Sequence, residues 1–323
     1  MQSIINLSAK KHKTLFRGKT KKYEIPTTPY IRGNAMLEES PVKVEYFGSI
    51  PKIIHQTWKN ENLPSQWREY FDGWYYKHPD FVHILWDDDD NLHLVEQHYP
   101  EFLDAYNWLP LMIQKTDFVR LMYLHKYGGI YADLDYECFE NILSHLPQEQ
   151  GVMLVESPLS LTEITQNSFM IAEAGHTFIY NVLQLIEEIV SDVREKHSIK
   201  YPFTKLYNNV FFGSFLHTLS TLFMTGPATL DKAFVRAYLK DDMKDDMKDE
   251  TSKPSKVRLL PHAQFYDGAV AKHHHNGTWF DGYNLLQLFI IVITLVLLAT
   301  LTAGILITYF STRSAYSKKY KVV

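Results

Sequence analysis

Short apolar segments alternate with longer helix-like segments between residues 51 and 132, and this alternation most constrains the fold. Strand-like segments cover 51–58 and 81–87, and a helix pattern that begins with a proline runs from Pro64 to Lys77. The same pattern predicts helices over 91–108, 111–127 and 176–197, and strands over 130–132, 151–156 and 257–266. The uncharged segment 208–224 is either a buried helix or a surface that dips into the bilayer. Strands that alternate with helices predict an α/β domain with a mostly parallel sheet, which binds ligands beyond the carboxyl ends of its strands.

One stretch of this pattern, KYGGIYADLD at 126–135, places two acids directly after a short strand. Gly128 fits the left-handed position just past the preceding helix. Asp133 and Asp135 follow the strand, so they lie at the edge of the sheet where ligands bind. A solvated turn explains an Asp-x-Asp pair on its own. The alternative is a site for a divalent cation, in which the second aspartate ligates Mg²⁺ or Mn²⁺ beside phosphate oxygens.

The helix before this stretch carries a charged pair within an apolar sequence. Asp117 and Arg120 are three residues apart and therefore share one helix face. An exposed ion pair would contribute little. Their neighbours Phe118 and Val119 instead indicate a buried helix, in which the charges need partners such as the hydroxyls of a sugar.

Composition excludes several classes of site. The 37 acidic and 33 basic residues give a net charge of −4, which does not favour nucleic-acid binding. The single cysteine, Cys138, permits no intrachain disulfide and no cysteine-based zinc site. Three histidines in KHHHNGTWF (272–280) are either a solvated loop or metal ligands that need a partner from a distant segment.

An uncharged segment near the C-terminus predicts a membrane helix. Leu285 to Phe310 would form a helix of about 39 Å, longer than the roughly 30 Å hydrocarbon core of a bilayer. The basic tail that follows predicts a cytosolic C-terminus and a catalytic domain across the membrane. A tail-anchored arrangement with a cytosolic domain stays open, because no signal peptide is recognisable. The predicted organisation is a basic, largely irregular arm (1–48), a main domain (49–282) with an acidic loop (241–254), a transmembrane helix (283–311) and a basic tail (312–323).

Four segments together resemble the DXD-containing sugar transferases of glycosyltransferase family 32: PKIIHQTWKN, HPDFVHILWDDD, KTDFVRLMYLHKYGGIYADLDYECFENI and MTGPATL. The resemblance spans residues 49–280 and is greatest to fungal inositol phosphoceramide mannosyltransferases. It implies a GT-A fold, with a Rossmann-like mixed sheet flanked by helices. It also implies retention of the anomeric configuration, and a nucleotide-sugar donor held with Mn²⁺ or Mg²⁺.

The resemblance also implies roles for individual residues. Trp58 would stack on the donor base, Asp117 and Arg120 would hold the sugar, and Asp135 would ligate the metal. The other implied positions are Asp133 (donor hydroxyls and metal), Asn167 (near the transferred sugar), His273 and His274 (metal), Thr278 and Trp279 (diphosphate), Gly129 and Tyr131 (donor pocket), and Gly226 and Pro227 (acceptor side).

The predicted reaction is transfer of a hexose, mannose from GDP-mannose, to inositol phosphoceramide in sphingolipid biosynthesis. The predicted location is the Golgi or another endomembrane, with a luminal catalytic domain and a small regulatory membrane subunit as a candidate partner. Two alternatives stay open. One is a mannosyl- or galactosyltransferase that acts on glycoprotein or polysaccharide glycans, and the other is a non-catalytic membrane partner of a transferase.

Overall fold

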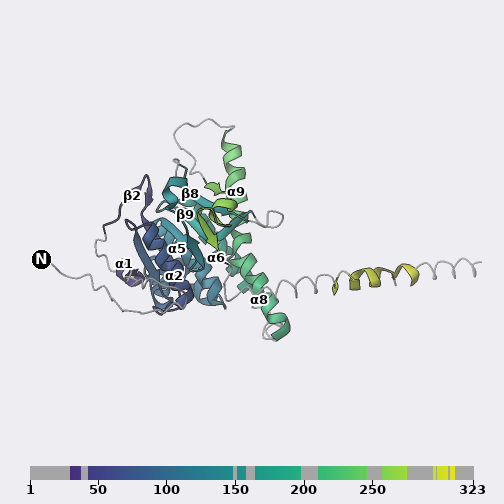
Figure 1. The fold of residues 1–323 in the computed structure, drawn as a ribbon. Coiled ribbons are helices and arrows are strands. Elements are labelled where there is room, and N and C mark those ends of the chain that lie inside the picture. Colours follow the sequence, from purple (N-terminus) through teal and green to yellow (C-terminus); the bar gives the residue numbers. More distant parts are fainter. Residues whose placement is uncertain are drawn as a thin grey trace, which may run out of the picture. The chain divides into compact units, whose positions relative to one another are not determined.

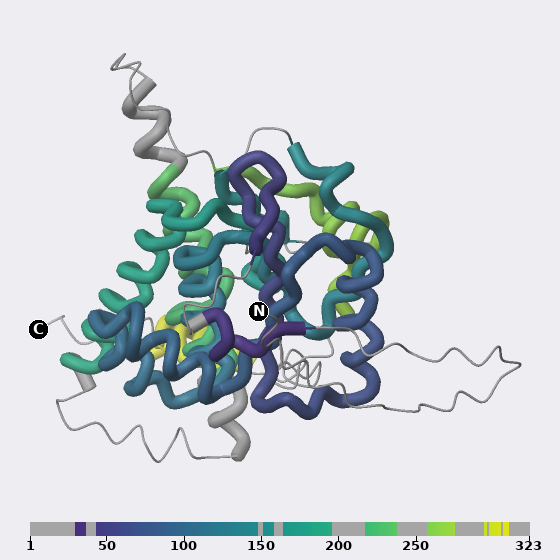
Figure 2. Tube along the Cα trace, turned by 90° about the vertical axis from the view of Figure 1, so that its left-hand side faces the viewer, coloured from purple at the N-terminus to yellow at the C-terminus, as the bar shows by residue number. Residues whose placement is uncertain are grey.

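The structure is a computed structural model (Figures 1 and 2). The contacts within the chain divide it into two units. The first unit comprises residues 1–201 and 219–276, and the second comprises 202–218 and 277–323. Within them, the residues that the structure describes are 30–37, 43–147, 151–157, 164–197, 210–245, 257–274, 294–295, 297–304 and 306–309.

A seven-stranded sheet in the order β1-β5-β4-β6-β9-β8-β10 is the centre of the first unit. Its strands are β1 (Ile31–Arg32), β4 (Ile53–Thr57), β5 (Val82–Trp86), β6 (Gly129–Ala132), β8 (Val152–Glu156), β9 (Thr165–Ala172) and β10 (Val257–Leu260). Strand β9 runs antiparallel to β6 and β8, and the other neighbouring pairs are parallel. The sheet is therefore mixed, and the predicted α/β class is confirmed.

Helices cover both faces of this sheet (Figure 1). They are α1 (Gly33–Leu37), α2 (Ser65–Lys77), α3 (Asp88–His98), α4 (Leu103–Trp108), α5 (Met112–Tyr127), α6 (Thr177–His197), α9 (Pro227–Asp245) and α10 (His262–Phe265), while α8 (Val210–Met224) spans both units. Two small sheets pair β2 (Tyr46–Phe47) with β3 (Ile50–Pro51), and β7 (Tyr136–Cys138) with β11 (Ala271–His273).

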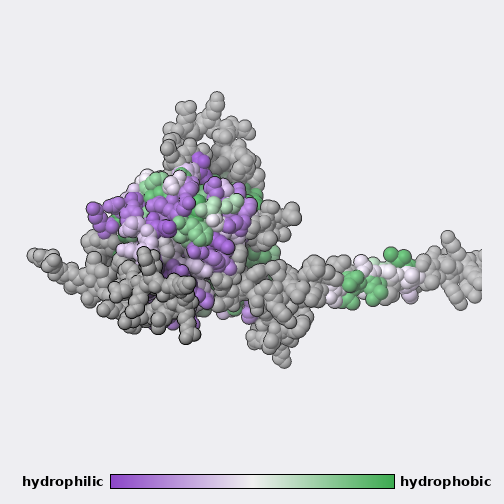
Figure 3. Space-filling view, in the orientation of Figure 1, coloured by the Kyte–Doolittle hydropathy of each residue, from purple (hydrophilic) through white to green (hydrophobic). Residues whose placement is uncertain are grey.

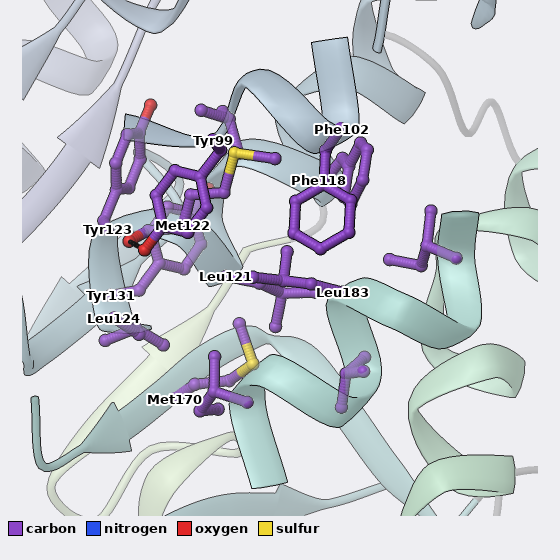
Figure 4. Packing of buried hydrophobic residues seen from close by; sticks show 14 of the residues in the cluster. Tyr99, Phe102, Phe118, Leu121, Met122, Tyr123, Leu124, Tyr131, Met170 and Leu183 are labelled. Atoms are coloured by element: carbon purple, nitrogen blue, oxygen red, sulfur yellow. Dashed lines mark hydrogen bonds between the residues drawn. The ribbon is translucent and has the colours of Figure 1, made fainter. Parts of the chain in front are cut away.

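Neighbouring residues of one strand belong to different cores, as the period of two in a strand requires. In β4, Ile53 packs in the cluster that contains residues of α3, α5 and α6, whereas Ile54 packs with Trp74 of α2 on the other face. Figure 4 shows the first cluster, in which Phe118 and Leu121 of α5 face Leu183 of α6. Strands buried on both faces account for the near-continuous apolar runs in the sequence.

Two predicted elements are shorter than expected because prolines interrupt them. The single helix expected over 91–108 is wrong: α3 ends at His98, a 3₁₀ turn covers Pro100–Phe102, and α4 follows. The strand expected over 257–266 ends at Leu260, since Pro261 precedes the short helix α10.

Three further regions differ from the sequence-based expectation. Strand β9 was not predicted. Part of the arm expected to be irregular is ordered, since Ile31 and Arg32 pair with Ile84 and Leu85 of β5. Part of the expected acidic loop, 241–245, forms the last turn of α9. Its remaining residues lie outside those described.

Among the residues that the structure describes, no helix combines the length and apolarity that a membrane crossing requires. The segment predicted to span a membrane is described only at 294–295, 297–304 and 306–309, which are helical. Apolar side chains such as Leu301 and Ile307 are exposed there. Figure 3 shows hydrophobic residues at the surface of this segment. The transmembrane helix stays a prediction.

Two consecutive glycines form the turn from α5 into β6. Gly128 ends the helix at φ 66° and Gly129 begins the strand at φ 97°, in the left-handed region that favours glycine. A Cβ atom at Gly129 would lie 2.6 Å from the carbonyl oxygen of Ile53 on β4. The absence of a side chain at Gly129 therefore permits the close approach of β6 to β4 directly after α5 ends.

A buried histidine ties this turn to two strands. The Trp86 Nε1–H donates to His55 Nδ1 at 3.1 Å, so the ring proton sits on Nε2, which lies 2.9 Å from the carbonyl oxygen of Gly128. Burial lowers the pKa of His55 to about 4, against an ordinary value of 6.5. His55 is therefore neutral in the folded protein at physiological pH.

We predict that acidification destabilises the fold through this histidine. In the unfolded chain His55 binds a proton near pH 6.5, whereas in the folded protein it does so only near pH 4. The stability that neutral His55 contributes is therefore fully present above pH 6.5 and is lost as the pH falls towards 4. The loss for this group is on the order of 3 kcal/mol. His55→Gln should reduce the slope of unfolding free energy against pH, measured by urea denaturation, whereas the exposed His93→Gln should keep it. Equal slopes for the two variants would contradict the assignment.

Candidate active site

The carboxyl ends of neighbouring strands supply the residues of the candidate site, as expected for an α/β sheet. Trp58 follows β4, Asp87 follows β5, and Asp133 and Asp135 follow β6. Strands β4 and β6 are adjacent and parallel in the sheet. Trp58, which is predicted to stack on the donor base, and the two aspartates therefore follow the carboxyl ends of neighbouring strands.

Arg120 lies at the centre of the predicted sugar-binding group. Its side chain is 3% exposed, and Nη2 lies 3.1 Å from Asp117 Oδ1 and 3.4 Å from Asp133 Oδ1. Nη1 donates to the carbonyl oxygen of Asn167 at 2.8 Å, and the guanidinium lies 4.6 Å from the ring centre of Tyr131. The Tyr131 hydroxyl donates to Asp133 Oδ1 at 2.6 Å. Helix α5 and strands β6 and β9 therefore converge on one cation.

Asp117 is held by two further side chains. Asn167 Nδ2 donates to Oδ1 at 2.9 Å, and Thr225 Oγ1 donates to Oδ2 at 3.0 Å. Burial raises the pKa of the Asp117 carboxyl to about 6; the charge of Arg120 opposes this rise and that of Asp133 adds to it. Burial also raises the pKa of Asp133, where Arg120 opposes the rise and Asp135 adds to it.

Asp133, Asp135 and His273 form a candidate metal site. Each offers one ligand atom, and these atoms all lie within 4.8 Å of one another. The antiparallel pairing of β11 with β7 places His273 opposite Tyr136, with its Nε2 3.2 Å from Asp135 Oδ1. Two carboxylates and an imidazole suit Mn²⁺ as a donor set, so the residues fit the expected ion.

His273 and His274, the two candidate histidine ligands of the metal, have different surroundings. His274 Nε2 lies 2.8 Å from Glu137 Oε2, and its ring stacks on Tyr70 with centroids 4.7 Å apart and an interplanar angle of 7°. Its backbone N–H donates to the carbonyl oxygen of Asp135 at 3.0 Å. Within the described residues, His274 is therefore engaged beside the candidate metal site, and His273 faces the carboxylates.

The other predicted site residues lie in elements next to this group or outside the described residues. Trp58 is half-buried and packs edge-on against Trp67, with ring centroids 4.4 Å apart. Gly226 and Pro227 form the junction of α8 and α9. Thr278 and Trp279 lie outside the described residues, so their roles stay predictions.

Sequence reasoning missed several contacts of the site among the described residues, and two of them join distant segments through hydrogen bonds. Thr225 contacts Asp117 across 108 residues of sequence, and Glu137 contacts His274 across 137 residues. Thr225 directly precedes the Gly-Pro pair of MTGPATL, one of the four segments that carry the family resemblance. Its position in that motif could have indicated that it lies near the site. Glu137 had no such signal.

Residues 64–152 match the family described as "Glycosyltransferase sugar-binding region containing DXD motif". This range contains Asp117, Arg120, Asp133 and Asp135. Arg120 contacts Asp117 and Asp133, and Asp133 and Asp135 belong to the candidate metal site. Over these residues the chain is therefore similar to DXD-containing glycosyltransferases, and the resemblance found in the sequence is confirmed.

Particular relatives carry more specific names. Inositol phosphoceramide mannosyltransferase 3 of Schizosaccharomyces pombe is 36% identical over 138 residues, which are 42% of this chain and 37% of that protein. Mannosyl phosphorylinositol ceramide synthase CSH1 of Saccharomyces cerevisiae is 34% identical over 154 residues, 48% of this chain and 38% of that protein. The matches thus span little more than a third of these two relatives.

The solved structure "PaToxG Glycosyltransferase" is 16% identical to this chain, with a TM-score of 0.40. The alignment covers 60% of this chain and 72% of that one. A likeness at this level carries no inference about function.

We predict that Mn²⁺ binds at Asp135 and His273. Asp135→Asn and His273→Gln should each weaken Mn²⁺ binding about tenfold or more, measured by calorimetry, because the first replaces a charged carboxylate with a neutral amide and the second removes the imidazole. The matched variant His274→Gln should bind within about threefold of wild type. Exposed Asp89→Asn tests for non-specific loss of acidic charge. Wild-type affinity in Asp135→Asn would contradict this metal site.

Proposed function

We propose that the protein is a membrane-associated glycosyltransferase that moves mannose from GDP-mannose to inositol phosphoceramide. The observation that carries the proposal is the buried Arg120 between Asp117 and Asp133. This group lies next to the Asp135–His273 pair, beyond the carboxyl end of β6. This group lies mainly within the region that matches DXD glycosyltransferases.

The charges of the site suit a nucleotide-sugar donor. Asp117 and Asp133 would accept hydrogen bonds from sugar hydroxyls, and the buried guanidinium of Arg120 fixes both carboxylates. A divalent ion, Mn²⁺ or Mg²⁺, held by Asp133, Asp135 and His273 would neutralise negative charge on the leaving diphosphate. The half-buried ring of Trp58 would stack on the guanine base.

The proposed step is a substitution at the anomeric carbon. The bond from that carbon to the diphosphate oxygen breaks, a bond to an acceptor hydroxyl oxygen forms, and the acceptor proton is released. Arg120 lies in a site of low exposure, where its positive charge acts strongly on the charge that the leaving group gains. We propose front-face substitution, with retention of configuration and without a covalent nucleophile.

The proposed acceptor rests on the names of similar proteins, and the proposed membrane location rests on the sequence. Two similar proteins are named for mannosyl transfer to inositol phosphoceramide or for its product, which supports a lipid acceptor. The apolar segment over 283–311 supports a membrane anchor. We place the protein in the Golgi or another endomembrane with a luminal catalytic domain, and a small regulatory membrane subunit is a candidate partner.

We predict that Asp135→Ala abolishes transfer. Purified protein with GDP-mannose, Mn²⁺ and inositol phosphoceramide in detergent should yield the mannosylated lipid by mass spectrometry. Asp135→Ala should lower the rate about 10²–10³-fold or more, because the donor diphosphate loses electrostatic stabilisation. Asp89→Ala, an exposed acid outside the site, should keep the wild-type rate.

Three outcomes would contradict parts of this proposal. Full activity of a folded Asp135→Ala variant would contradict the mechanism. Wild-type transfer to a glycoprotein or polysaccharide acceptor, but not to the lipid, would replace the acceptor. Wild-type protein that neither hydrolyses nor transfers from any nucleotide sugar would indicate a non-catalytic partner.

A further inference from the structure

Thr225 lies at the junction of α8 and α9 and contacts the predicted sugar-binding group from outside it. The residue is 3% exposed. Its Oγ1 lies 3.0 Å from Asp117 Oδ2 and 3.5 Å from the carbonyl oxygen of Thr221. A hydroxyl donates one proton, and the shorter contact to a charged oxygen is the stronger one. Thr225 therefore donates chiefly to Asp117.

The described contacts of Asp117 are unevenly divided between its two oxygens. A carboxylate has about four acceptor sites, two on each oxygen. Arg120 and Asn167 both contact Oδ1, and Thr225 contacts Oδ2. Among the described residues, the acceptor site that remains on this carboxylate is therefore on Oδ2, the oxygen that Thr225 holds.

The local backbone fixes the position of Thr225. Both its N–H and that of Gly226 donate to the carbonyl oxygen of Thr221, at 3.1 and 2.8 Å. A Cβ atom at Gly226 would lie 2.9 Å from that same oxygen, and α9 begins at Pro227. This tight end of α8 determines where the Thr225 hydroxyl lies relative to α5.

We propose that Thr225 is a positioning residue for the donor sugar, whose hydroxyl orients Asp117 Oδ2 so that the remaining acceptor site on this oxygen receives a sugar hydroxyl. This inference rests on the proposed function, because it requires a nucleotide-sugar donor. It adds a residue 108 positions away in sequence from the carboxylate that it orients.

The chain offers matched variants for this test. Thr225→Val keeps the shape of the side chain and removes the donor, while Thr225→Ser keeps the donor. Thr229 is a control from the same junction, because it is 2% exposed and its Oγ1 donates to the carbonyl oxygen of Phe223 at 2.8 Å. Thr229→Val therefore removes a buried hydrogen bond of similar kind without a contact to Asp117.

The measurement compares the affinities of GDP-mannose and GDP, each with Mn²⁺, by calorimetry on the full chain. The ratio of the GDP-mannose affinity to the GDP affinity gives the contribution of the sugar to binding. Thr225→Val should weaken GDP-mannose binding about tenfold, or about 1.4 kcal/mol, and leave GDP binding unchanged. Thr225→Ser and Thr229→Val should keep the wild-type ratio, although Thr229→Val should lower the melting temperature. In an Asp117→Ala background, which removes the carboxylate that Thr225 contacts, Thr225→Val should cause no further loss, since the two residues act as one unit.

The outcomes separate this inference from the function on which it rests. A wild-type chain that binds GDP-mannose, with the same ratio in folded Thr225→Val, would overturn the positioning role alone. Parallel loss of GDP and GDP-mannose binding in Thr225→Val would overturn it as well, because it would indicate general distortion. A wild-type chain that binds neither GDP-mannose nor UDP-hexoses would overturn both the positioning role and the proposed donor.

Discussion

The buried Arg120 is the constraint on which the site depends. A guanidinium at 3% exposure loses most of its hydration, and such a charge is tolerated only with close anionic and hydrogen-bonding partners. Asp117 on the same helix, Asp133 after β6 and the backbone of Asn167 on β9 supply these partners. Because each comes from a different packed element, the position of the guanidinium requires helix, strand and loop to be correctly assembled. The same contacts hold two carboxylates ready for a polar ligand.

The sheet places these partners, and two small features complete the arrangement. Strand β6 lies between β4 and β9, so Asp133 and Asn167 come from adjacent strands. The absence of a side chain at Gly129 permits the close approach of β6 to β4 directly after α5, the helix that carries Asp117 and Arg120. The pairing of β11 with β7 then brings His273 beside Asp135. The candidate metal site and the Arg120 group thus share Asp133 and are parts of one arrangement.

Much of this was predictable from sequence where the signal is local. The apolar strand 130–132, the helix that ends at Gly128 and the DXD pair all follow from residue pattern and glycine geometry. Strand β9 was missed because its first residues, Thr165 to Asn167, are polar and mask its apolar end. The difference between His273 and His274 depends on the register of β11 against β7, which three consecutive histidines do not reveal. The Thr225–Asp117 contact joins distant segments and arises only in the tertiary structure.

The most direct test of the account is the variant Arg120→Lys, measured for mannose transfer. Lysine keeps the charge but lacks the planar group that contacts Asp117, Asp133 and Asn167 together. If Arg120 organises the donor site, the folded variant, which keeps Asp135 and His273 for Mn²⁺, should lose transfer about 10²-fold or more. Wild-type transfer by Arg120→Lys would contradict the central role assigned to the buried guanidinium.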